Sequence, residues 1–123
     1  MRERNIMLLH YATGLGILVF GAIHVFVVFF TYPLQGTIWE TTLKFDNIPF
    51  AILPVYRNAI LAASLWGLLL CTTIHSMNGL RVILLELIGE RGAMRVVSKV
   101  LYLVGVIIMI YGTRTIIVAN MIT

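Results

Sequence analysis

Three histidines, His10, His24 and His75, are the residues of this 123-residue sequence with the clearest capacity for chemistry. Each lies in a long apolar stretch, where an ionisable side chain is uncommon and is a functional candidate by default. A neutral imidazole can bind a metal through one ring nitrogen. It can equally hydrogen-bond a hydroxyl or carbonyl of a neighbouring helix and hold two helices together. The residue type alone leaves both interpretations open.

The residues that share a helix face with each histidine help to distinguish a metal ligand from a contact between helices. In a helix, Gly14, Gly21 and His24 each lie within roughly 40° of His10 around the axis, and glycine lets another group approach the backbone closely. The approaching group is either a neighbouring helix, which is the more common reason for glycines on a helix face, or a flat macrocycle. The face around His75 is small and polar and consists of Ser64, Leu68, Cys71, Thr72, Asn78, Gly79 and Glu86. We therefore expect the histidines to face protein or cofactor rather than lipid.

No other chemical apparatus is visible in the sequence. It has no glycine-rich phosphate loop, no nucleophile elbow and no H-E-x-x-H zinc motif. The single Cys71 excludes an internal disulfide and a C-x-x-C-H site for covalent haem. Glu40 and Asp46 are expected to be solvated loop residues rather than an acid–base pair.

The composition predicts the protein class. Hydrophobic residues make up 60% of the chain and charged residues only 11%, whereas a soluble domain has about a quarter charged residues. A chain this short cannot bury so much apolar surface within one soluble core. We therefore expect an all-α integral membrane protein that forms a single domain over residues 1–123.

Three apolar stretches are long enough to cross a hydrocarbon layer of about 30 Å as helices. We expect membrane-spanning helices at about 7–32, 57–82 and 98–120. The segment 33–56 is expected as an interfacial loop and 83–97 as a cytoplasmic loop. We expect the amphipathic piece from Arg81 to Glu90 to extend the second helix beyond the bilayer. The helix-breaking residues near the expected ends are Pro33, Gly36, Pro49, Pro54, Gly89 and Gly92.

The basic residues predict the orientation. The positive-inside rule puts the N-terminus and the second loop in the cytoplasm and the C-terminus outside. The first loop has only Lys44 and Arg57, opposed by two acidic residues, and the first stretch is too long for a cleaved signal peptide. The basic residues on the cytoplasmic side are Arg2, Arg4, Arg81, Arg91, Arg95 and Lys99. This topology accounts for the positive net charge without a nucleic-acid partner.

Depth separates two of the histidines. His24 is expected roughly 12 Å below the outer boundary of the membrane, and His75 roughly 9 Å above the inner one. They then differ in depth by about 10 Å or more. The two axial ligands of one haem that stands upright in the bilayer need similar depth. His24 and His75 therefore suit two different haems, whose other ligands come from a second membrane subunit.

Three segments resemble one family. The segment from Ile74 to Arg81 resembles the H-x-x-x-G-hydrophobic-R/W signature of the cytochrome b membrane anchors of succinate:quinone oxidoreductase, respiratory complex II. The segment from His10 to Gly14, followed by His24, is similar to the first-helix pattern of that family. The segment from Tyr111 to Arg114 looks like its third helix. The likeness extends over nearly the whole chain.

The resemblance implies a haem b-binding anchor for a flavoprotein subunit and an iron–sulfur subunit. Electrons from succinate would pass through the iron–sulfur subunit toward membrane quinone. His75 and His24 match haem-ligand positions, so this chain would supply one ligand to each of two haems and a second anchor subunit the others. Gly14, Gly21 and Gly79 would lie on the cofactor side of the helices.

Three further residues are candidates near the cofactor. Arg81 and Arg114 are candidate partners of haem propionates, although snorkelling to the lipid headgroups explains either one. A propionate partner explains Arg114 better than Arg81, because Arg114 lies deeper. His10 is either a quinone or propionate contact or a plain interfacial residue, and we favour the latter. The chain has Tyr11 where many family members have arginine, which leaves the quinone site unassigned.

Two other functions stay open. The chain can be a haem-free structural or assembly subunit whose histidines bond helices together, or a small transporter component. The lack of paired acidic residues within the spans argues against a transporter. By itself the chain carries no succinate-oxidising apparatus. We expect it in the plasma membrane of a bacterium or archaeon, because no transit-type leader is visible.

Overall fold

Three long helices make up nearly all of the described chain. The computed structural model describes residues 3–27, 58–89 and 91–121. Helix α1 spans Glu3–Phe26, α3 spans Ala59–Ile88 and α4 spans Arg91–Met121. Each is long and apolar enough to cross a membrane, and the described ranges contain no strand. The predicted all-α fold with three membrane-spanning helices is therefore confirmed.

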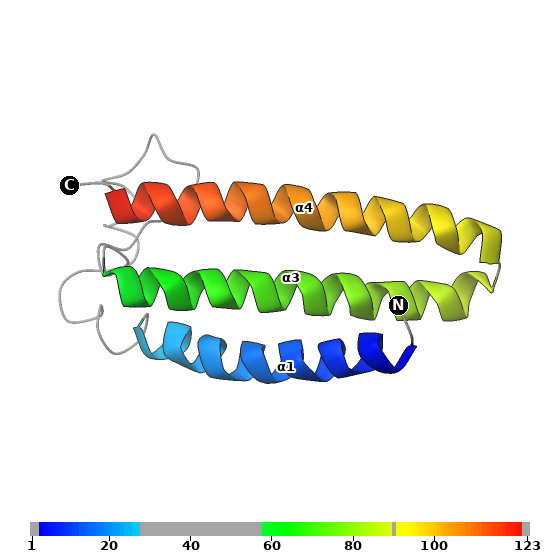
Figure 1. Ribbon diagram of the computed structural model, residues 1–123, viewed down its shortest axis with the longest axis horizontal. Coiled ribbons are helices and arrows are strands. Elements are labelled where there is room, and N and C mark those ends of the chain that lie inside the picture. The colour runs from blue at the N-terminus through cyan, green and yellow to red at the C-terminus, as the bar shows by residue number, and fades with distance from the viewer. Residues whose placement is uncertain (1–2, 28–57, 90, 122–123) are drawn as a thin grey trace.

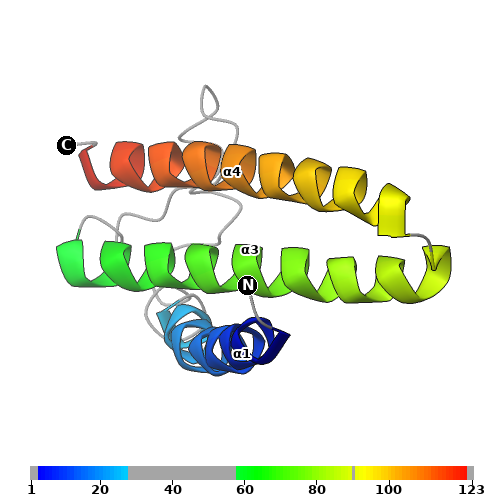
Figure 2. The same cartoon turned by 45° about the vertical axis from the view of Figure 1, so that its right-hand side comes forward.

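Helix α3 is the middle helix (Figures 1 and 2). Consecutive helices run in opposite directions, so the start of α1, the end of α3 and the start of α4 lie at one end of the molecule. Helices α1 and α4 both pack on α3 and make almost no contact with each other. Every contact that brings distant functional side chains together therefore involves α3.

The helices extend beyond the expected spans at the shared end. Within the segment 83–97, α3 continues to Ile88, in agreement with the extension expected from Arg81 to Glu90, and α4 begins at Arg91. Gly89 ends α3 in the left-handed region, at φ 68°, and its N–H donates to the Leu85 carbonyl at 3.1 Å. The expected loop 33–56 lies outside the described residues.

Glycines let the helices approach closely. A Cβ on Gly16 would collide with Cys71 Sγ, and one on Gly67 would lie 2.9 Å from the Phe20 ring. On the other side of α3, a Cβ on Gly112 would lie 2.9 Å from Leu69 Cδ1. Small residues at helix contacts are typical of membrane bundles, where close packing replaces the hydrophobic effect as the driving force for association.

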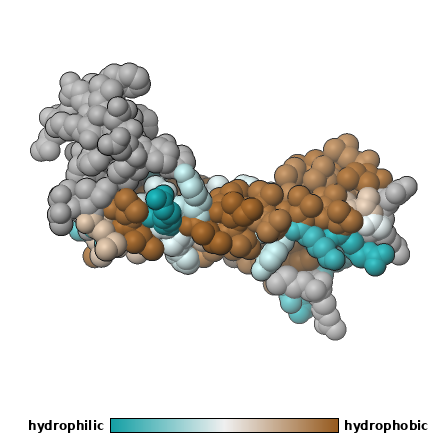
Figure 3. All heavy atoms as spheres, turned by 90° about the horizontal axis from the view of Figure 1, so that it is seen from above, coloured by the Kyte–Doolittle hydropathy of each residue, from teal (hydrophilic) through white to brown (hydrophobic). Residues whose placement is uncertain are grey.

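The outer surface is strongly apolar. Hydrophobic residues cover most of the described surface visible in Figure 3. Large side chains such as Leu18 and Ile60 are 71% and 79% exposed. Four hydrophobic residues of the described ranges are buried, namely Val27, Ala62, Met94 and Ala119. Such a surface suits lipid or other membrane helices and would be unfavourable in water.

Candidate functional site

Two of the three histidines meet between α1 and α3. The rings of His10 and His75 stack, with centroids 3.9 Å apart and an angle of 16° between their planes. Both side chains are partly buried. The sequence had indicated that each histidine faces another body, but nothing in their spacing indicated that these two face each other.

The ring of His75 also bonds to the backbone of α1. Its Nδ1 lies 3.1 Å from the His10 carbonyl oxygen and 3.4 Å from Thr13 Oγ1. A carbonyl oxygen can only accept, so Nδ1 of His75 carries the proton and donates it. Nε2 then has a lone pair, and it has no hydrogen-bond partner among the described residues. His75 thus contacts the neighbouring helix through one nitrogen and leaves the other available.

Two glycines make room for this pair. A Cβ on Gly14 would lie 3.2 Å from His75 Cε1, and one on Gly79 would lie 3.4 Å from His10 Cε1. Each helix therefore offers a glycine to the imidazole of the other. Gly21 is different, since its nearest neighbour would be Leu68 Cδ1 at 3.9 Å, an ordinary contact. That these three glycines contact a cofactor stays a prediction.

His24 is far from the stacked pair. It lies fourteen positions beyond His10 on the same helix, which corresponds to about 21 Å along α1. Because His10 contacts His75, His24 and His75 are too far apart to bind one iron between them. His24 is partly buried.

Polar contacts link the helices near their shared end. Asn78 Nδ2 donates to the Ile6 carbonyl at 3.3 Å, and Arg81 Nε donates to Ser98 Oγ at 3.1 Å. Arg81 is thereby directed toward α4, whereas His75 faces α1. Arg114 is exposed on α4. The propionate role expected for the two arginines stays a prediction.

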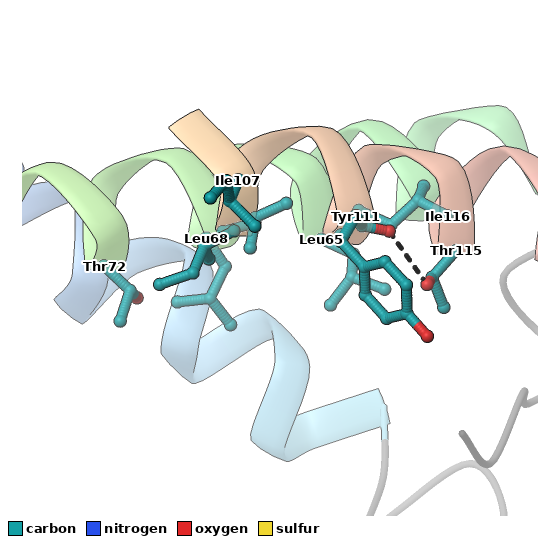
Figure 4. A pocket seen from close by; sticks show the side chains of 10 residues that line it. Leu65, Leu68, Thr72, Ile107, Tyr111, Thr115 and Ile116 are labelled. Carbon is teal, nitrogen blue, oxygen red and sulfur yellow. Dashed lines mark hydrogen bonds between the residues drawn. The ribbon is translucent and has the colours of Figure 1, made fainter. Parts of the chain in front are cut away.

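An apolar groove of about 610 Å³ lies between α3 and α4 (Figure 4). One of its few polar groups, the Thr115 hydroxyl, donates to the Tyr111 carbonyl at 3.0 Å. The groove is lined by Leu65, Leu68, Leu69, Thr72, Ile107, Ile108, Tyr111, Gly112, Thr115 and Ile116. It therefore suits hydrocarbon and presents little that could recognise a polar group.

Thr13 is the functional candidate that sequence reasoning missed. It lies in the segment quoted for the family resemblance, but no contact with His75 was predicted for it. The side chain is only 6% exposed. Its position one turn after His10 was the available signal, because residues three apart share a helix face.

Comparison with known proteins supplies one strong finding. A family model described as succinate dehydrogenase/fumarate reductase transmembrane subunit matches residues 5–116. The matched range contains His10, His24 and His75 and parts of all three helices. Comparisons with curated proteins and with solved structures gave no significant match.

Proposed function

The chain belongs to the family of succinate dehydrogenase/fumarate reductase transmembrane subunits, and from this membership we propose that it binds haem b and carries electrons toward quinone. It is a multi-pass membrane subunit of such a complex and serves as a membrane anchor. The finer proposal is that His75 and His24 would each hold the iron of one of two haems. A second anchor subunit supplies the other two ligands.

The observation that carries this proposal is that Nε2 of His75 has a lone pair and no hydrogen-bond partner among the described residues. Metal-bound histidines almost always donate their other ring N–H to a carbonyl, carboxylate or water, which fixes the tautomer. His75 has this arrangement, with Nδ1 donating to the His10 carbonyl at 3.1 Å. The residues present therefore fit an imidazole-ligated haem. A haem iron held by two imidazoles has no open position and passes electrons rather than binding oxygen.

The position of His24 supports two haems rather than one. About 21 Å of helix separates it from His10 and hence from the level of His75. Ligands this far apart serve different irons. The flavoprotein and iron–sulfur subunits are the proposed soluble partners, quinone the acceptor, and the plasma membrane of a bacterium or archaeon the proposed location.

A haem-free structural role is the second candidate. The stacked rings and the bond from His75 to the α1 backbone are helix contacts in their own right. They would hold α1 against α3 without any cofactor. This alternative predicts that the histidines affect assembly and stability but not a haem spectrum.

Haem content of the purified complex separates the candidates. We expect a b-type α-band in the reduced-minus-oxidised spectrum of the wild type. His75→Ala and His24→Ala should each remove one haem and leave the other. Ser64→Ala is a control, because its hydroxyl bonds within α3 to the Leu61 carbonyl, and it should keep both haems.

Two results would contradict the proposal. Absence of the α-band from an assembled wild-type complex would favour the haem-free role. Loss of both haems from His75→Ala, with none lost from His24→Ala, would refute the assignment of one ligand from this chain to each haem.

A further inference from the structure

We infer that Thr13, Gly14 and the His10 carbonyl of α1 are the groups that fix the tautomer and orientation of His75, so that Nε2 is held as the ligating nitrogen. The inference rests on the proposed role of His75 as a haem ligand. It goes beyond that role by naming what orients the ligand. Thr13 and Gly14 are positioning residues, because each acts through the imidazole of His75.

The His10 carbonyl determines which nitrogen carries the proton. It accepts from His75 Nδ1 at 3.1 Å and has no proton to give. A neutral imidazole has one N–H, so Nε2 keeps its lone pair. An acceptor on the non-ligating nitrogen also makes the ligating nitrogen a stronger donor to a metal.

The Thr13 hydroxyl adds a second acceptor. Its single proton is directed to backbone carbonyls, at 2.8 Å from Leu9 O and 3.0 Å from His10 O. The oxygen therefore faces His75 Nδ1, 3.4 Å away, with a lone pair. Thr13 is 6% exposed, so water does not readily replace this contact.

Gly14 and the His10 ring restrict rotation of His75. A Cβ at position 14 would lie 3.2 Å from Cε1 and 3.5 Å from Nδ1 of His75. The His10 ring stacks on the same imidazole at 3.9 Å. An added methyl group would therefore displace the His75 ring by a few tenths of an ångström and disturb the bond from Nδ1.

The test compares matched pairs of variants in the purified complex. Gly14→Ala is paired with Gly92→Ala, which adds the same methyl group at the start of α4, where no atom lies within 4 Å of the new Cβ. Thr13→Val, which keeps the volume but loses the acceptor, is paired with Thr13→Ser, which keeps a hydroxyl. The measurements are haem transfer to excess apomyoglobin, the haem midpoint potential, and the low-spin electron paramagnetic resonance signal of the oxidised haem.

Gly14→Ala and Thr13→Val should weaken haem binding by roughly 10- to 100-fold, the range found when partners of metal-bound histidines are removed. The potential of the haem bound by His75 should rise, because an imidazole without its acceptor stabilises ferric iron less. Gly92→Ala and Thr13→Ser should resemble the wild type.

The outcomes distinguish this inference from the proposed function. Unchanged haem transfer and potential in Thr13→Val and Gly14→Ala, with haem still lost from His75→Ala, would overturn the positioning role and leave the ligand assignment standing. Full haem content in His75→Ala would overturn both. Equal effects of Gly14→Ala and Gly92→Ala would show a general effect of the added methyl group and also contradict the inference.

Discussion

The contact between His10 and His75 depends on individual glycines of both helices. Each imidazole lies against a glycine of the facing helix, Gly14 for His75 and Gly79 for His10. Nδ1 of His10 is buried without a hydrogen-bond partner in the described structure. An unpaired buried nitrogen is unfavourable, so the position of the His10 ring carries a local energetic cost.

A second contact between side chains links α3 and α4. Trp66 Nε1 donates to Thr113 Oγ1 at 3.0 Å. Trp66→Phe should lower the unfolding free energy of the complex by about 0.6 kcal/mol, the average for hydrogen bonds between membrane helices. Equilibrium unfolding in detergent measures the change. Thr113→Val should have a similar effect, and the double variant little more than either single one. Additive losses would show that the two side chains do not interact.

The sequence identified the right residue types but not their pairing. Helical spacing correctly put His75 on one face with Asn78 and Gly79, and all three contact residues of α1. It could not show that His10 is the residue opposite His75. That depends on how α1 and α3 are aligned along their lengths, which is a property of packing between helices and leaves no periodic signal within either one.

At the scale of elements, hydropathy located the helices better than it located their ends. The membrane-spanning part of α3 was expected to end near residue 82, with the helix extending beyond the bilayer toward residue 90, and α3 does continue to Ile88. Helix α4 begins at Arg91 rather than near 98. Apolar runs mark the part of a helix that lies in lipid. A helix that satisfies its own backbone can continue into the polar region until a residue such as Gly89 ends it.

Close packing of α1 on α3 gives a prediction about Gly67. Gly67→Ala should destabilise the complex by about 1–3 kcal/mol, because the added Cβ would overlap the stiff Phe20 ring, three of whose atoms lie within 3.1 Å of it. Thermal unfolding of the purified complex measures this change.

Gly92→Ala is the matched control for Gly67. It adds the same methyl group where no atom lies within 4 Å, and it should be neutral or stabilising by up to about 1 kcal/mol. A Gly67→Ala complex as stable as the Gly92→Ala complex would mean that α1 can move away from α3 without penalty.

At the scale of the whole molecule, charge is concentrated at one end. Among the described residues, Arg114 is the charged residue that lies apart from the others. The others occur at the start of α1, the end of α3 and the start of α4 and are Glu3, Arg4, Arg81, Glu86, Arg91, Arg95 and Lys99. This distribution supports the predicted cytoplasmic position of that end.

Cysteine labelling tests this orientation. In a Cys71→Ser background, Met121→Cys should react with a membrane-impermeant maleimide added to intact cells, because Met121 is 72% exposed at the opposite end. Lys99→Cys should react only after the cells are opened. The reverse pattern would invert the topology and exchange the depths assigned to His24 and His75.

The lack of contact between the two outer helices has a consequence for biosynthesis. Because α1 packs on α3 and barely touches α4, the His10–His75 pair needs only the part of the chain up to Gly89. A ribosome completes that part before it reaches α4. The nascent subunit can therefore form this contact while translation continues, before the last helix is made.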